Sequence, residues 1–119
     1  MKERLLAAIR ELRAPIERNE YDLHRLVMQS LAKKGIPCQH EALLAPGSRV
    51  DLLCGRIAVE LKRGKVQKAA LNRQLEKYAA TGVVDGIVVV SEQHVTVPER
   101  IGDVWIEAIS LFALWGIVS

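Results

Sequence analysis

The sequence predicts a mixed α/β fold, because segments with helical and with strand periodicity alternate along a chain of 119 residues. Residues 2–13 and about 19–34 carry apolar side chains three and four positions apart, as amphipathic helices do. Residues 56–62 alternate between large apolar side chains and small or charged ones, which is typical of a strand with two different faces. Residues 86–90 form a run rich in β-branched side chains, which indicates a strand buried on both faces.

The composition is that of an ordinary globular domain. The length suits one domain, and hydrophobic residues make up 50% of the chain and charged residues 26%. The net charge of +3 is compatible with a nucleic-acid partner without being diagnostic of one. Aromatic residues make up only 4%, which argues against a protein that binds single strands by stacking their bases.

The first residues lack the apolar core of a signal peptide, and the longest apolar stretch, residues 109–118, is too short to span a bilayer. We therefore expect a cytoplasmic protein that is not inserted in a membrane. Cys38 and Cys54 have no CxxC spacing and no histidine at ligand spacing, which disfavours a zinc site. A disulfide between them is compatible with the sequence but not required by it.

The first half of the chain predicts two helices and a meander of three strands. The helix over 2–13 is expected to end before Pro15. The next helix is expected to start with Asn19 as its N-cap, to have Asp22 at its third helical position, and to end before Gly35. A strand over 38–44 and a hairpin of strands 49–54 and 56–62 then form an antiparallel meander.

The second half predicts a helix over 66–80, the strand over 86–90, a loop over 94–102 and a last strand over 104–109. The apolar tail over 111–118 has two interpretations. It packs onto the core, or it forms a surface for a homodimer. The predicted order of elements is ααβββαββ.

The hairpin carries the residues that favour chemistry. Glu60 and Lys62 lie on one face of their strand, and in-register pairing places Asp51 on the same face. Hard cations such as Mg²⁺ prefer oxygen ligands, so the two carboxylates and the backbone carbonyl of Leu61 suit a metal site. Lys62 would orient an attacking water or stabilise developing charge. The alternative is a surface ion pair between Glu60 and Lys62, which contributes at most about 1 kcal/mol.

Two residues near the start of the second predicted helix each have two interpretations. Glu20 is either an acid favoured by the helix dipole or a carboxylate that reaches the hairpin. His24, four positions later, is either a packed or surface histidine or a ligand.

Asp51, followed after eight residues by Glu60-Leu61-Lys62, resembles the D-x(n)-E-x-K signature of the PD-(D/E)XK nuclease superfamily. Gln74 and Tyr78 resemble the Q-x-x-x-Y motif of its RecB-type members. Val50 stands where the family name has proline. The resemblance implies a restriction-endonuclease-like αβββαβ core over about 19–91 with an extra N-terminal helix. The strand and tail over 104–119 complete a single domain, 1–119.

The same resemblance implies roles for single residues. Asp51 and Glu60 would bind Mg²⁺ or Mn²⁺ with the carbonyl of Leu61, and Glu20 would be an accessory ligand. Lys62 would be the catalytic lysine. Gln74 and Tyr78 would orient the lysine or the substrate phosphate; the alternative for them is an amphipathic pair on a helix surface.

Basic residues close to the hairpin are candidates for contacts with nucleic-acid phosphates: Arg49, Arg63, Lys65, Lys68 and Arg73. The alternative is a solvated helix face. The sequence thus predicts a metal-dependent nuclease acting on DNA, with a homodimer as the way for one short chain to cut both strands. The competing hypotheses are a catalytically inactive nucleic-acid-binding or assembly module of the same fold and a purely structural protein.

Overall fold

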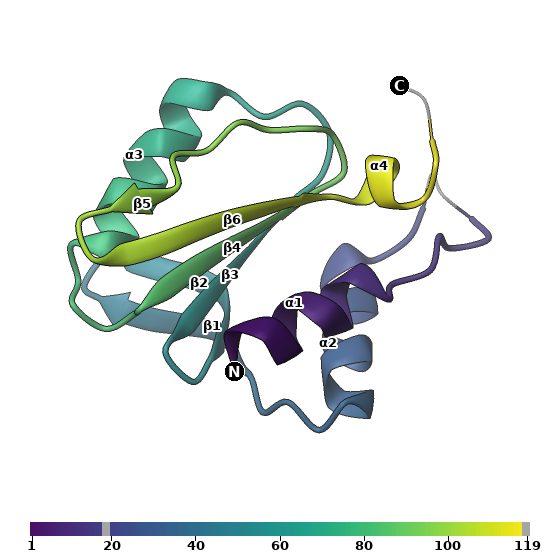
Figure 1. Cartoon of the computed structure of the whole chain (residues 1–119), viewed down its shortest axis with the longest axis horizontal. Helices are drawn as coiled ribbons and strands as arrows, with labels where there is room; N and C mark the ends of the chain where they lie inside the picture. The colour runs from purple at the N-terminus through teal and green to yellow at the C-terminus, as the bar shows by residue number, and fades with distance from the viewer. Residues whose placement is uncertain (18–19, 118–119) are drawn as a thin grey trace.

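The computed structural model describes residues 1–17 and 20–117, and within them a mixed six-stranded sheet lies between helices on its two faces (Figure 1). In chain order the elements are α1 Lys2–Arg10, α2 Leu23–Lys33, β1 Gln39–Ala45, β2 Ser48–Cys54, β3 Ile57–Lys62, α3 Lys68–Ala79, β4 Gly86–Ser91, β5 Arg100–Ile101, β6 Val104–Ser110 and α4 Leu111–Leu114. The predicted mixed α/β class is confirmed.

The strands lie in the order β1-β2-β3-β4-β6-β5. The first three form the expected antiparallel meander, and Gly55, with a φ of +62°, allows the tight turn between β2 and β3. β3, β4 and β6 run parallel, so their carboxyl ends lie at one edge of the sheet. β5 is a two-residue edge strand antiparallel to β6, inside the segment predicted to be a loop.

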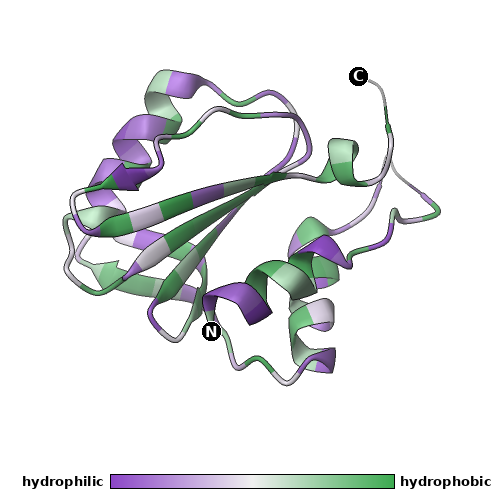
Figure 2. Ribbon diagram, viewed as in Figure 1, coloured by the Kyte–Doolittle hydropathy of each residue, from purple (hydrophilic) through white to green (hydrophobic). Residues whose placement is uncertain are grey.

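The sheet has a hydrophobic core on each face. Leu52, Ile57, Val59 and Leu61 pack with α1 and α2, whereas Ala58 packs with α3. The predicted alternation of β3 is therefore confirmed. Figure 2 shows hydrophobic residues along the central strands and hydrophilic ones over much of α3, which covers the sheet alone on its side.

The helices begin and end at different residues from those predicted. α1 ends at Arg10 rather than at residue 13, and α3 begins at Lys68 because Gln67 has an extended backbone. The predicted start of the second helix was wrong. Asp22 is its N-cap and accepts a hydrogen bond from the backbone N–H of Arg25 at 3.1 Å. Asn19, the predicted cap, lies outside the described residues.

Two residues of the apolar tail, Leu111 and Trp115, pack onto the core. Leu111 is fully buried against the layer of α1 and α2. The indole Nε1 of Trp115 donates a hydrogen bond to the carbonyl of Leu12 at 3.0 Å, and its ring meets Tyr21 edge-on. Of the two interpretations, packing describes Leu111 and Trp115, whereas Leu114 is exposed and the homodimer stays a prediction.

Cys38 and Cys54 form a disulfide across the open end of the β1–β2 hairpin, with their Cα atoms 4.3 Å apart. The pairing of Gln39 with Leu53 places the two cysteines opposite each other. Disulfides persist mainly in oxidising compartments, so the cytoplasmic location stays a prediction. No helix among the described residues is long and apolar enough to cross a membrane.

Candidate metal-dependent hydrolytic site

The β1–β2 hairpin bends at Glu41 and Asp51. Val50 packs against α3, yet Leu52, two residues further on, packs against α1 and α2. An unbent strand would keep both side chains on one face. Glu41 has a φ of +52°, which is uncommon for a residue other than glycine. The bend turns the Asp51 side chain towards the gap that opens between β2 and β3.

Side-chain hydrogen bonds replace the β2–β3 ladder at this gap. The regular pairs end with Leu52 opposite Val59, so Asp51 and Glu60 come next. Asp51 Oδ2 accepts a hydrogen bond from the backbone N–H of Leu61 at 2.7 Å, and the backbone N–H of Asp51 donates to Glu60 Oε1 at 3.4 Å. The two carboxylates therefore meet where the strands separate, as the in-register hairpin predicted.

The carbonyl of Leu61 faces the same gap. The carbonyl of Lys62 accepts a hydrogen bond from the backbone N–H of Glu92 at 3.0 Å, so it points towards the β4 side. Successive residues of a strand direct their N–H and C=O groups to opposite edges, and the N–H of Leu61 already meets Asp51. The Leu61 carbonyl, which is the third oxygen predicted for a metal site, thus lies on the edge of β3 that faces β2 and Asp51.

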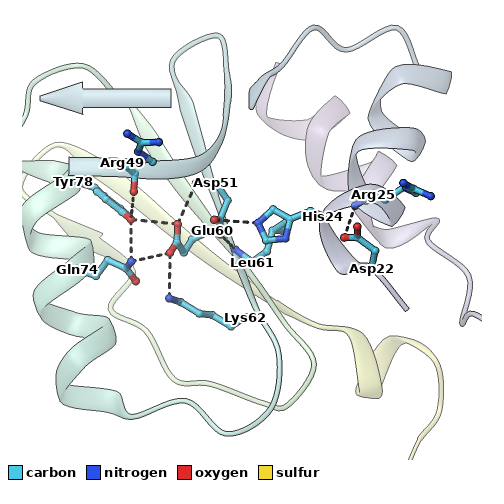
Figure 3. A network of polar contacts seen from close by, with 10 residues as sticks. All are labelled: Asp22, His24, Arg25, Arg49, Asp51, Glu60, Leu61, Lys62, Gln74 and Tyr78. Carbon is cyan, nitrogen blue, oxygen red and sulfur yellow. Dashed lines mark hydrogen bonds and ion pairs between the residues drawn. The ribbon is translucent and has the colours of Figure 1, made fainter. Parts of the chain in front are cut away.

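Glu60 is a buried carboxylate with several donors. Its side chain is 5% exposed, and Oε2 accepts from Gln74 Nε2 at 2.7 Å and pairs with Lys62 Nζ at 3.1 Å (Figure 3). Burial, and then the Asp51 carboxylate, raise the pKa of Glu60, while Lys62 opposes them. A cation beside these two carboxylates would offset both the burial of the Glu60 charge and the repulsion between Glu60 and Asp51.

Gln74 and Tyr78 lie one turn apart on α3 and reach the site together. Gln74 Nε2 also donates to the Tyr78 hydroxyl at 2.9 Å. That hydroxyl donates to the backbone carbonyl of Arg49 at 2.8 Å and lies 3.3 Å from Glu60 Oε1. Burial and the Glu60 carboxylate raise the pKa of Tyr78, so it remains a protonated donor. The surface-pair alternative fails for Tyr78, which is buried.

His24 joins the site from α2, with Nε2 at 3.2 Å from Asp51 Oδ1 (Figure 3). The network therefore crosses the gap from α2 on one face of the sheet to α3 on the other. From the sequence alone, His24 is either a packed or surface histidine or a ligand. The available signal was Asp22, because an N-cap there places His24 at the second helical position, next to the buried Leu23.

The structure does not bring Glu20 into this group. Because α2 begins only at Leu23, Glu20 lies outside the helix and its side chain is exposed. Among the described residues, no hydrogen bond or ion pair joins Glu20 to Asp51 or Glu60. The residue that contacts Asp51 from this part of the chain is His24.

The donor chemistry of the gap suits a hard divalent cation, but one of its oxygens, Glu60 Oε2, already has two partners. Within residues 1–17 and 20–117, no group of three or more His, Cys, Asp or Glu side chains is arranged to hold a metal ion. Asp51 keeps an acceptor position on each oxygen, whereas Glu60 Oε2 has both positions filled by Gln74 and Lys62. A cation on Glu60 Oε2 would therefore require the Lys62 ammonium to move.

Most of the basic residues that were predicted to contact phosphate are accessible to a substrate. The side chains of Arg49, Lys65, Lys68 and Arg73 are exposed. Lys62, Lys65 and Gln74 line a cavity of about 350 Å³ beside the first turn of α3. A phosphate entering this cavity would approach Lys62 directly.

Arg63 instead makes contacts within the protein, with Glu92 and Tyr21. Its Nε donates to Glu92 Oε2 at 3.1 Å and its Nη1 to the carbonyl of Tyr21 at 2.8 Å, while the guanidinium stacks over the Tyr21 ring. The Tyr21 hydroxyl and the N–H of Gly64 also donate to Glu92. Because Glu92 is buried, its charge needs these donors. Arg63 therefore stabilises Glu92 within the protein, and its contact with phosphate stays a prediction.

Arg63→Met is expected to lower the free energy of unfolding at neutral pH by about 1–3 kcal/mol, because buried Glu92 loses a charged donor. Burial would raise the pKa of Glu92, but its hydrogen bonds from Tyr21, Gly64 and Arg63 hold the pKa below its usual value. A depressed pKa contributes stability above the unfolded-state pKa, and this is lost as pH falls through the folded-state pKa. The loss measured by urea denaturation should therefore shrink in acid.

Arg56→Met is the matched control, because the pair of Arg56 with Asp85 is exposed. Its loss should be about 0–1 kcal/mol. Equal losses in the free energy of unfolding of the two variants would contradict the inference that Arg63 stabilises buried Glu92.

Comparisons of the chain with models of known families, with curated proteins and with solved structures found no match. Function is therefore inferred from the residues and distances given above.

Proposed function

We propose that this protein is a metal-dependent nuclease with a restriction-endonuclease-like core, which hydrolyses phosphodiester bonds in DNA. The observation that carries the proposal is the convergence of Asp51, Glu60 and Lys62 where β2 and β3 separate. An exposed ion pair would not account for a buried glutamate with a raised pKa facing a second carboxylate.

In the proposed mechanism Asp51, Glu60 and the Leu61 carbonyl would hold Mg²⁺ or Mn²⁺, which would supply a water of lowered pKa and offset charge on the phosphate when bound. His24 acts on Asp51, either as a hydrogen-bond donor that fixes this carboxylate or as a nitrogen ligand beside it.

Lys62 positions the attacking water or stabilises the negative charge that develops on the phosphate. Gln74 fixes the Glu60 carboxylate through its hydrogen bond to Oε2. Tyr78 holds the first residues of β2 in place by donating a hydrogen bond to the Arg49 carbonyl.

The exposed cations around the site, Arg49, Lys65, Lys68 and Arg73, are suited to hold the nucleic-acid backbone. Such contacts position a substrate without reading its sequence. We therefore expect cleavage that depends on the structure of the DNA rather than on a long target sequence. Cutting of both strands would require two copies of the chain, in a homodimer.

The test is to incubate the purified protein with flapped, branched, single-stranded and double-stranded DNA, with matched RNA, and with or without Mg²⁺ or Mn²⁺. The wild type should cut one or more DNA substrates only with metal, whereas Asp51→Asn should not. Metal-independent cutting, or equal cutting by Asp51→Asn, would refute the proposal. Salt-sensitive DNA binding without cutting would instead support the inactive nucleic-acid-binding module.

A further inference from the structure

Ser91 ends β4 as a fully buried hydroxyl. Among the described residues, its Oγ has no hydrogen-bond partner. A buried hydroxyl without a partner makes the folded protein less stable than a methyl group in the same place would. A second state in which the Ser91 hydroxyl gains a partner would offset this loss of stability.

Ser91 is adjacent to the candidate site. It is the residue of β4 paired with Lys62 of β3 in the parallel register. Val89, two residues before Ser91, packs on the α3 face, so Ser91 leaves the sheet on that same face. Glu60 and Lys62 also point to this face, towards Gln74 of α3. Neighbouring strands are about 5 Å apart, so the long Lys62 side chain can reach the Ser91 hydroxyl.

The present partner of Lys62 is the oxygen that a metal would need. Lys62 Nζ lies 3.1 Å from Glu60 Oε2, and Gln74 occupies the other acceptor position of that oxygen. If Glu60 coordinates a cation through Oε2, the ammonium loses this acceptor. An ammonium has three N–H donors and no acceptor, so it then requires a lone pair nearby. The Ser91 hydroxyl offers one.

We propose that Ser91 is a positioning residue that accepts a hydrogen bond from the Lys62 ammonium when Glu60 binds a divalent cation. Lys62 thereby changes partner from Glu60 to Ser91 and stays beside the reacting phosphate instead of moving into solvent. This inference rests on the metal binding in the proposed function. It goes beyond that function because it assigns a role to a residue of β4 outside the hairpin and α3.

The test is a double-mutant cycle on metal affinity. Mn²⁺ binding is measured by calorimetry for the wild type, Ser91→Ala, Lys62→Met and the double variant. Ser91→Ala should weaken Mn²⁺ binding about tenfold when Lys62 is present, because the bound state loses a hydrogen bond from a charged donor. In the Lys62→Met background the same change should alter affinity by less than about twofold, since the cycle isolates the pairwise contact.

Two further variants keep the test specific. Ser91→Thr retains the hydroxyl and should restore the affinity, and Ser48→Ala removes another buried serine hydroxyl and should leave it unchanged. Without metal, Ser91→Ala should unfold at the same or a higher denaturant concentration than the wild type. Lower stability of metal-free Ser91→Ala, or the same affinity loss in both Lys62 backgrounds, would overturn the proposal.

Metal binding and cleavage of nucleic acid are measured in separate assays, so that the role of Ser91 and the nuclease activity are tested independently. A wild type that binds no Mn²⁺ overturns the role of Ser91. A wild type that binds Mn²⁺, follows the cycle and cuts no nucleic acid supports the role of Ser91 and refutes the nuclease.

Discussion

Glu60→Gln is expected to lower metal-dependent cleavage on the order of 10³-fold and to make the metal-free protein more stable at neutral pH. The activity falls because a neutral amide is a poor ligand for Mg²⁺ and no longer offsets its charge, which removes several kcal/mol of transition-state stabilisation. The stability rises because Glu60 is a buried carboxylate whose pKa is raised by burial and by Asp51.

The pH dependence of this effect has a definite sign. A raised pKa means that the folded protein keeps a proton on Glu60 after the unfolded chain has released it. The stability that Glu60 contributes is therefore complete below the unfolded-state pKa and is lost as pH rises through the folded-state pKa. Glutamine does not titrate, so the gain in stability of Glu60→Gln should appear only above the unfolded-state pKa.

The amide also fits most of the hydrogen bonds at this position. Its oxygen can replace Oε2 and accept from Gln74 and Lys62, and its NH₂ group can donate to the Tyr78 hydroxyl. That hydroxyl is free to accept because its own proton goes to the Arg49 carbonyl. The long hydrogen bond of 3.4 Å from the backbone N–H of Asp51 to Oε1 is the one that the NH₂ group cannot accept.

The measurements are kcat/KM on a labelled DNA substrate and urea denaturation from acid to neutral pH. Glu76→Gln, an exposed position on α3, is the matched control and should leave both quantities near those of the wild type. Cleavage at the wild-type rate by Glu60→Gln would refute the assignment of Glu60 as a ligand. A stability difference independent of pH would show that burial does not govern the pKa of Glu60.

Gly86→Ala is expected to have the largest effect on stability, a loss of about 3 kcal/mol or more. A Cβ at Gly86 would lie 2.0 Å from Cε2 and 2.2 Å from Cζ2 of Trp105, its paired residue on β6. The indole is partly buried against the core cluster on the α1 and α2 side of the sheet, so moving it would disturb that packing. The parallel pairing of β4 and β6 would have to shift.

Gly102→Ala serves as the control for the glycine change itself. Gly102 has a φ of +59°, and a Cβ added there would meet no atom within 4 Å, so its replacement should cost only about 1 kcal/mol. Combining Gly86→Ala with Trp105→Leu should recover part of the loss, because the clash is removed. Urea denaturation of the wild type and these variants measures this, and a Gly86→Ala protein as stable as Gly102→Ala would contradict the β4–β6 register.

The strands were predictable because their signals are local. Alternation along Ile57–Lys62 follows from the pleat of a single strand, and the turn at Gly55 follows from its backbone freedom. These two features predicted that Asp51 and Glu60 would be neighbours, since a tight turn leaves few registers for the hairpin. Helix starts were less predictable, because Asn19 and Asp22 are both good caps in the sequence.

The sequence by itself determined the mixed α/β class, the meander and the group formed by Asp51, Glu60 and Lys62, because each depends on backbone preferences within one or two turns of chain. The tertiary structure decided which distant side chains reach that group: His24 binds Asp51, Glu20 stays outside, and Arg63 is committed to Glu92. It also paired Ser91 with Lys62 through the parallel β3–β4 register. Such contacts depend on how helices dock and on which strands become neighbours, and residue periodicity alone specifies neither.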